Sequence, residues 1–277
     1  MKKNILLLVL ILFVFSISSV FSQDITIKEG TYNTQSGNKL EVYCPGGDVK
    51  LNSSGAEQVI LKITGNQKAQ DNLDILVNEL STGINISVTL KNRNESSNIN
   101  LSIEVTVPMK YNAEIKTAGG DVECNNVEGN ISIKTAGGDI LLENCTGSFD
   151  VATAGGDISA KRIKGELEAK TAGGNLNLDA EVCKITAKTA AGTIDLSYLG
   201  ENKGIDMKTN SGDIRVYLPD NINADCTFST IGGGTSCEFD LRDITTNTSK
   251  LLVGRINAGG PNIYLSTNFG SIQVRKP

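Results

Sequence analysis

The stretch IKTAGGDIL, residues 133–141, decides the fold, because the chain repeats its central six residues. The motif Thr-Ala-Gly-Gly-Asp-Ile recurs almost unchanged at intervals of 18 residues. Its copies begin at Thr117, Thr135, Thr153 and Thr171, in degraded form at Thr189, and once more after 20 residues at Thr209. A short fixed period predicts small structural units that stack on one another, each in contact with the next.

Each unit contains two similar halves. The sequence GDISAK at residues 156–161 is answered by GELEAK at residues 165–170. Each half begins with Gly and continues with alternating apolar and polar residues, which predicts a strand with one buried face. Gly supplies the backbone angles of a tight bend, whereas a helix needs a spacing of 3.6 residues between apolar positions. The sequence therefore predicts an all-β fold, a parallel β-solenoid with two main strands in each rung of about 18 residues.

Stacking brings the same position of every unit into one column. The inward columns should form the core, and they include Ile131, Ile133, Phe149, Val151, Ile140 and Leu142. The repeated Thr also has inward parity, so it should form a ladder of hydrogen-bonding side chains near a corner. The outward columns place acidic residues beside Lys, which predicts a solvated face with weak ion pairs.

The pattern divides the chain into three parts. Residues 1–22 combine a basic start, an apolar stretch and small residues, which predicts a cleaved signal peptide. Residues 23–112 contain strand-like segments separated by Asn, Gly and Ser, and should form a β cap that leads into the first rung. Residues 113–277 are the predicted solenoid, with regular rungs over 113–217 and irregular rungs over 218–277.

Composition excludes several classes of function. The chain has no His and no Trp, and its net charge is −5. Without His there is no imidazole base and no His-ligated metal, and a negative chain gives no electrostatic support to nucleic-acid binding. We expect no cofactor, no transmembrane helix after signal cleavage, and a monomer exported to the periplasm, the cell surface or the medium.

The Asp that follows each Gly pair is a candidate metal ligand. Stacking should align Asp121, Asp139, Asp157 and Asp213, with Asn175 in the same column. Because Ca²⁺ binds several oxygen ligands, such an Asp ladder could hold it. The alternative is that each Asp accepts a hydrogen bond from the backbone of its own bend.

Six Cys without a CxxC pair make zinc improbable, while an oxidising compartment would permit disulfides. Cys226 and Cys237 flank a Gly-rich bend and are the candidate pair. Residues half a rung apart can lie on opposing sheets about 10 Å apart, which is too far for a bridge. Cys124 and Cys145 fall on core positions and are expected to act as small apolar side chains.

The segment LSIEVTVPMKYNAEIKTAGGDVECNNVEGNISIKTAGGDI, residues 101–140, resembles the bacterial putative-adhesin family of exported β-solenoid repeat proteins. That family is similar in its apolar strand ending in Val-Pro, its Thr-x-x-Gly-Asp-Ile units, and an ending like Ala258-Gly259-Gly260-Pro261 with residues 267–272, TNFGSI. The resemblance covers about residues 40–275. It implies the repeat fold, and it brings no catalytic residues with it.

Three hypotheses of function follow. The first is a non-enzymatic cell-envelope protein, adhesin-like or a scaffold, which binds an unidentified protein or glycan through a rigid repeat surface. The second is a Ca²⁺-dependent binding module that uses the Asp ladder. The third is a polysaccharide-degrading enzyme on a β-helix, since paired carboxylates can cleave glycosides. We expect no enzymatic activity, because the acidic residues recur with the repeat.

Overall fold

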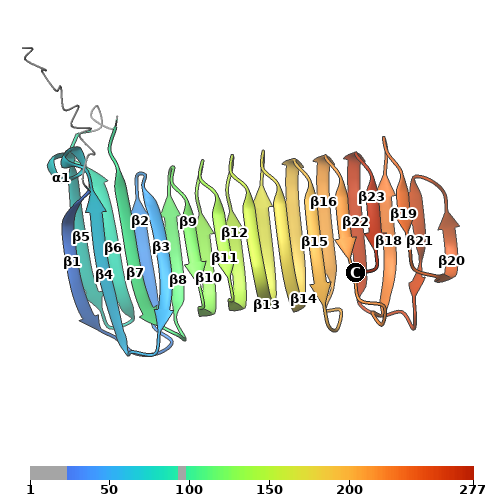
Figure 1. Cartoon of the computed structure of the whole chain (residues 1–277), viewed down its shortest axis with the longest axis horizontal. Helices are drawn as coiled ribbons and strands as arrows, with labels where there is room; N and C mark the ends of the chain where they lie inside the picture. Colours follow the sequence, from blue (N-terminus) through green and yellow to red (C-terminus); the bar gives the residue numbers. More distant parts are fainter. Residues whose placement is uncertain (1–23, 93–97) are drawn as a thin grey trace, which may run out of the picture.

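The computed structural model describes residues 24–92 and 98–277. These residues form 23 strands and one short helix, α1 (Gln67–Asn72), so the predicted all-β class is confirmed. Figure 1 shows an elongated body in which the strands lie side by side along the long axis. The expected signal peptide, residues 1–22, lies outside the described residues.

The strands form two ladders, which we call ladder A and ladder B. In spatial order ladder A contains β5 (Leu73–Leu80), β6 (Gly83–Leu90), β2 (Lys39–Cys44), β8 (Asn112–Thr117), β10 (Glu128–Lys134), β12 (Thr146–Ala152), the later parts of β13 (Ile158–Thr171) and β14 (Leu176–Ala191), β16 (Ile205–Ser211), β22 (Asn262–Phe269), β18 (Ala224–Thr230), β21 (Leu251–Ile256) and β20 (Leu241–Asn247).

Ladder B lies opposite, and in the regular middle of the body the chain enters it after each strand of ladder A. It contains β1 (Ile25–Asn33), β4 (Gln58–Gly65), β7 (Leu101–Pro108), β3 (Asp48–Ser54), β9 (Val122–Asn125), β11 (Ile140–Glu143), the early parts of β13 and β14, β15 (Ile194–Leu199), β17 (Ile214–Tyr217), β23 (Ile272–Arg275) and β19 (Thr235–Cys237).

The middle of the body repeats strictly. Ile131 pairs in parallel with Phe149, and Phe149 pairs with Leu167, so that residues 18 apart in sequence are neighbours. After β14 the spacing becomes 20, because Ile185 pairs with Ile205. One rung therefore contains two more residues than the others, and these extend the bend between β15 and β16.

Near each end the chain leaves the sequential order. The rung formed by β2 and β3 lies between β6 and β7 on one side and β8 and β9 on the other. At the far end, β22 and β23 lie between β16 and β17 and the pair β18 and β19. Figure 1 accordingly places the C-terminus inward of β18 and β21. Part of the expected cap, residues 39–54, thus pairs in parallel with the first repeat strands.

Antiparallel strands complete both ends. At the N-terminal end, β5 pairs with β6, and β4 lies between β1 and β7. At the C-terminal end, β21 lies between β18 and β20. These strands cover edges of the parallel rungs that would otherwise offer free backbone groups to another chain.

The core fills the space between the two ladders as one continuous cluster. The inward columns expected from the sequence are buried, including Ile131, Phe149, Ile140 and Leu142, each at most 2% exposed. The described residues contain no helix with the length and apolar character needed to cross a bilayer.

Candidate binding surface

The repeated Thr residues connect neighbouring rungs at one corner. Thr153 is 6% exposed; its hydroxyl donates to the carbonyl of Gly138 (2.9 Å) and accepts from the backbone N–H of Gly156 (3.2 Å). Equivalent bonds to the preceding rung are made by Thr117, Thr135, Thr171, Thr189, Thr209, Thr267 and Thr230. The Thr ladder therefore satisfies buried backbone groups.

The second Gly of each motif is needed because the rungs approach closely there. A Cβ atom built on Gly138 would lie 1.9 Å from the carbonyl oxygen of Gly120, far inside van der Waals contact. A Cβ atom on Gly137 would meet nothing within 4 Å. Thr-Ala-Gly-Gly is thus a corner that joins rungs, and its steric requirement rests on the second Gly.

The Asp ladder follows the same corner. The Asp121 carboxylate accepts the backbone N–H of Asp139 (2.8 Å), and Asp139 accepts that of Asp157 (2.7 Å). The series begins with Asp48, which accepts from Asp121 (3.0 Å), and continues from Asp157 to Asn175 (2.6 Å). Each carboxylate thus bonds to the next rung, whereas the sequence predicted a bond within its own bend.

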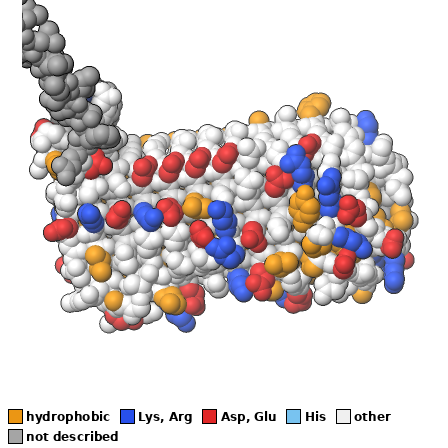
Figure 2. Space-filling model, in the orientation of Figure 1, with side chains coloured by type: hydrophobic (Ala, Val, Ile, Leu, Met, Phe, Trp, Pro, Cys, Tyr) orange, Lys and Arg blue, Asp and Glu red, His pale blue; other side chains and the backbone are white. Residues whose placement is uncertain are grey.

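Asp213 is separated from this series by Asn175 and Thr193 and accepts from Ser271 (2.8 Å). Figure 2 shows an evenly spaced row of acidic groups along the body, as regular stacking requires. Among the described residues, no three His, Cys, Asp or Glu side chains come together as a metal-ligand set. The carboxylates of the ladder accept hydrogen bonds from the backbone of the next rung.

Cys226 and Cys237, the candidate disulfide pair, are free thiols in this structure, as are the other four Cys. Cys226 pairs with Ile263 in ladder A, whereas Cys237 pairs with Val274 in ladder B. The two residues therefore belong to opposite ladders. Burial is the main reason that the pKa of Cys226 is raised, to about 12, which keeps this thiol protonated.

The outward side of ladder A carries two columns of opposite charge, which we call the charged face. Its acidic column contains Glu41, Glu114, Asp150, Glu168 and Asp206, and its basic column contains Lys116, Lys134, Lys170, Lys188 and Lys208. Ion pairs join the columns, as between Lys134 and Asp150 (3.5 Å) or Lys208 and Asp206 (3.1 Å). The charges are thus largely paired within the face.

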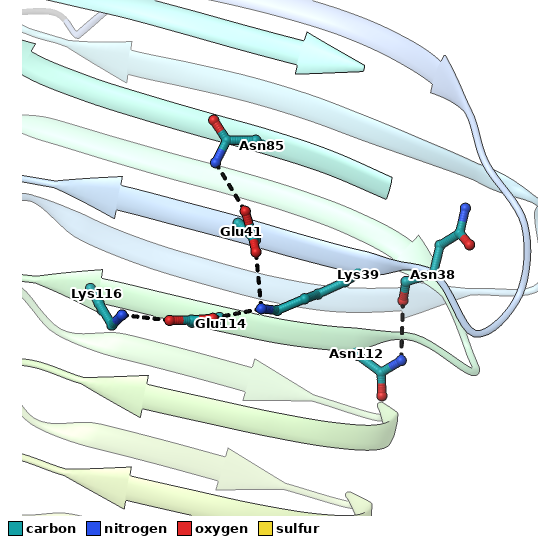
Figure 3. A network of polar contacts seen from close by, with 7 residues as sticks. All are labelled: Asn38, Lys39, Glu41, Asn85, Asn112, Glu114 and Lys116. Carbon is teal, nitrogen blue, oxygen red and sulfur yellow. Dashed lines mark hydrogen bonds and ion pairs between the residues drawn. The ribbon is translucent and has the colours of Figure 1, made fainter. Parts of the chain in front are cut away.

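A polar network ties the out-of-order rung to its neighbours at the N-terminal end (Figure 3). The Lys39 ammonium binds Glu41 (2.9 Å) and Glu114 (2.6 Å), and Asn85 donates to Glu41 (3.2 Å). Hydrogen bonds from Lys116 and then Lys39 lower the pKa of Glu114 from its ordinary 4.5 to about 2. The same network raises the pKa of Lys39, mainly through Glu114. This network holds β6, β2 and β8 in register.

Each out-of-order rung also presents a Tyr beneath a Lys ammonium. Lys116 Nζ lies 5.2 Å from the centre of the Tyr43 ring, and Lys208 Nζ lies 4.8 Å from the centre of the Tyr264 ring. Both are cation–π contacts. Both Tyr residues are half-buried, and one lies at each end of the charged face.

The face is hollowed where the longer rung extends its bend. A hollow of about 520 Å³ is lined by Lys184, Ile185, Thr186, Lys203, Gly204, Ile205, Asp206, Lys208, Pro261, Asn262 and Tyr264. A second hollow of about 480 Å³ is lined by Gly200, Glu201, Asn202, Asn221, Ile222, Asn223, Gly259 and Pro261. They share Pro261, so the two hollows are adjacent.

The comparison with family models decides the identity of the chain, because one model matches residues 19–275. The chain belongs to the Toastrack DUF4097 family. A search of the curated proteins finds no match.

Solved structures that are similar to this chain include three from bacteria. A Bacteroides fragilis protein described as a "putative adhesin" is 16% identical, with a TM-score of 0.51 over 91% of this chain and 97% of that one. A Clostridium sporogenes "putative cell adhesion protein" is 10% identical (TM-score 0.32, 90% and 99% covered), and a Parabacteroides distasonis "putative lipid binding protein" is 15% identical (TM-score 0.38, 90% and 96% covered). At these identities the likeness of the first shows the fold alone.

Sequence reasoning found the columns of this Toastrack chain but missed its irregular features. Asp48 extends the Asp ladder, yet it lies outside the clear repeats and follows a Pro-Gly-Gly rather than a Thr-Ala-Gly-Gly stretch. The hollow beside Tyr264 was also missed, because it joins segments that are far apart in sequence. The change of spacing from 18 to 20 at Ile205 was the signal that could have located it.

Proposed function

We propose that this chain is an exported, non-enzymatic protein of the cell envelope, adhesin-like or a scaffold, which binds its partner through the charged face. The observation that carries the proposal is the continuity of this face. Its columns keep one register from β2 to β16, a stretch in which every strand pair is parallel. Such a surface presents the same groups at a fixed spacing to a long partner.

Rigidity supports a binding role. The Thr ladder and the continuous core hold each rung against its neighbours. Little conformational entropy is then lost when the face binds, because its backbone is ordered beforehand. The paired charges contribute more to orientation and selectivity than to affinity.

The chemistry of the face favours binding over catalysis. Its acidic groups form ion pairs with Lys residues of the same strand or the next, as Asp150 does with Lys134 and Asp206 with Lys208. A glycosidase requires one carboxyl that holds its proton beside a second that is ionised. The pKa of Glu114 is instead lowered, and so is the pKa of Glu168, mainly by Lys170. Both carboxyl groups therefore lose their protons more readily than usual, whereas a general acid must keep its proton.

The test is retention of the purified chain on whole envelope preparations. Lys134→Glu with Lys170→Glu reverses two outward-facing charges of the charged face, while Lys50→Glu with Lys161→Glu makes the matched change on ladder B. We expect the first pair to weaken retention about tenfold and the second to change it less than about twofold. Circular dichroism and melting confirm that both variants are folded.

Retention that both variants lose equally would contradict the assignment to the charged face. A wild-type chain that is not retained would contradict the binding role itself. Turnover of an envelope polysaccharide by the wild-type chain would favour the enzyme hypothesis. Retention that requires Ca²⁺, with melting raised by Ca²⁺, would favour the calcium module.

A further inference from the structure

The extended bend of the longer rung is a fixed structure. Tyr198 is 1% exposed, and its hydroxyl accepts the backbone N–H of Cys183 (3.0 Å). The same hydroxyl lies 2.9 Å from the carbonyl oxygen of Cys183 and 2.8 Å from that of Glu201. A buried Tyr with its polar end satisfied packs firmly, so the bend at residues 200–204 is held against the preceding rung.

Asn202 joins this bend to two other loops. It is 3% exposed and donates to the carbonyl oxygens of Asn223 (3.1 Å) and Pro261 (2.6 Å). Its own side-chain oxygen accepts the backbone N–H of Gly204 (2.9 Å). Three loops, at residues 200–204, 219–223 and 257–261, therefore meet around one buried amide and form the walls between the two hollows.

The charges around the larger hollow are already neutralised. Lys184 pairs with Glu166 (2.8 Å), Lys203 with Glu201 (2.7 Å), and Lys208 with Asp206 (3.1 Å). An anionic ligand would have to compete with these carboxylates. The same groups offer alternating donors and acceptors, the arrangement that a neutral ligand rich in hydroxyl groups requires.

Two further groups point to such a ligand. Asp206 Oδ1 is shielded from solvent, yet it has no hydrogen-bond partner in the described part of the chain. An unpaired buried acceptor is costly unless a donor reaches it. Tyr264 pairs with Asp206 across the ladder, and Lys208 lies over its ring, which fixes a half-buried aromatic surface at the edge of the hollow.

We propose that the hollow beside Tyr264 is a saccharide-binding subsite for a neutral oligosaccharide. The Tyr264 ring packs against an apolar face of a sugar ring, the Asp206 carboxylate, whose side chain is 39% exposed, accepts a sugar hydroxyl, and Asn262 and Lys203 contribute further polar contacts. The adjacent hollow at Asn221 and Asn223 takes the neighbouring sugar unit. This inference rests on the proposed binding function and names its ligand class and its place.

The experiment is calorimetric titration of the full folded chain with four probes. Cellohexaose, maltohexaose and the hexamer of N-acetylglucosamine are neutral, and the hexamer of galacturonic acid is acidic. We expect saturable binding of at least one neutral probe and none of the acidic one. Tyr264→Ala should raise the Kd of the neutral probe about tenfold, because the aromatic contact is lost. Asp206→Asn should raise the same Kd by a smaller factor.

A matched variant keeps the test specific. Tyr217→Ala removes a partly exposed Tyr from ladder B, outside the charged face. It should bind the probe as the wild type does. Neutral-sugar binding that survives Tyr264→Ala, or that is lost with Tyr217→Ala as well, overturns the subsite.

Failure of this inference is distinguishable from failure of the proposed function. A chain that is retained on envelope preparations but binds none of the neutral probes keeps its binding role and loses the subsite. Preference for the acidic hexamer also overturns the subsite, because the Lys residues around the hollow would then bind an anion despite their carboxylate partners. A chain that shows neither retention nor sugar binding loses both.

Discussion

The middle rungs and the two ends of this protein are built from similar strands, but they differ in whether strands that are neighbours in space also follow one another in sequence. From β8 to β14 every rung lies beside the rung that precedes it in sequence, at a spacing of 18 residues. At each end, one strand instead lies between two strands that are distant from it in sequence. These are β2 between β6 and β8, and β22 between β16 and β18. The regular part supplies a uniform face, whereas the hollows and the Tyr–Lys contacts occur where order or spacing changes.

The largest effect should come from a charge in the regular core. Ile140 is 1% exposed, and Ile140→Asp would bury a carboxylate between rungs. We expect a loss of more than about 5 kcal/mol in the free energy of unfolding, enough to leave no cooperative melting transition. The control Lys134→Ser changes an outward side chain and should shift melting little. Equal effects would mean that the inward and outward columns are misassigned.

A smaller but clear loss should follow from a single methyl group at the regular corner. Gly138→Ala places Cβ 1.9 Å from the Gly120 carbonyl oxygen, so the rungs must separate. We expect a cost of about 3 kcal/mol. Gly137→Ala, with open space around its Cβ, should cost less than about 0.5 kcal/mol. Chemical denaturation measures both, and similar losses would contradict the close approach of the rungs.

At the N-terminal end the expected effect depends on pH. The pKa of Glu114 is lowered to about 2 in the folded state, so its contribution is complete above its ordinary 4.5 and is lost as the pH falls from there towards 2. Across that window the wild type should lose about 2–4 °C of melting temperature relative to Glu114→Gln. Glu29→Gln, an exposed change on β1, is the control. Parallel melting curves for all three proteins would contradict the role of the network.

The smallest effect should be a gain, at the point where the regular spacing ends. Val182 has a φ of 48°, and Asn126, Asn144 and Arg162 have similarly positive φ values at the corresponding bends of earlier rungs, although the register shifts before Val182. A β-branched residue is strained in this region, whereas Asn tolerates it. Val182→Asn should therefore stabilise the protein by about 1 kcal/mol. Val182→Ala removes the branching at Cβ but lacks the polar side chain with which Asn favours this region, so it should gain less. A loss with Asn would contradict the assignment of strain.

The repeats predicted the local structure because each side-chain position has one environment in every regular rung. Ile140 and Phe149 could be assigned to the core, and Thr153 to a corner ladder, from parity alone. Chain order at the ends could not be predicted, because a strand that fits one rung fits any rung. The TNFGSI segment, residues 267–272, was visible as an echo of the motif, but its neighbours in space were not.

The candidate site divides in the same way. The charged columns follow from the period, and the sequence predicted them. The cluster around Asn202 depends on a buried amide that reaches two distant loops, and no local pattern encodes such a contact. The Asp ladder shows an intermediate case: its alignment was predictable, while the bond from each carboxylate to the next rung was not.

The place of β22 and β23 makes the far end of the body dependent on strands that come late in the sequence. These strands come near the end of the sequence, yet two rungs made earlier can be joined only through them. A chain that stops before residue 262 leaves β16 and β18 without their shared neighbour and exposes two open strand edges, which attract other chains and proteases. Closure of the body thus depends on strands that are synthesised after both of the rungs that they join.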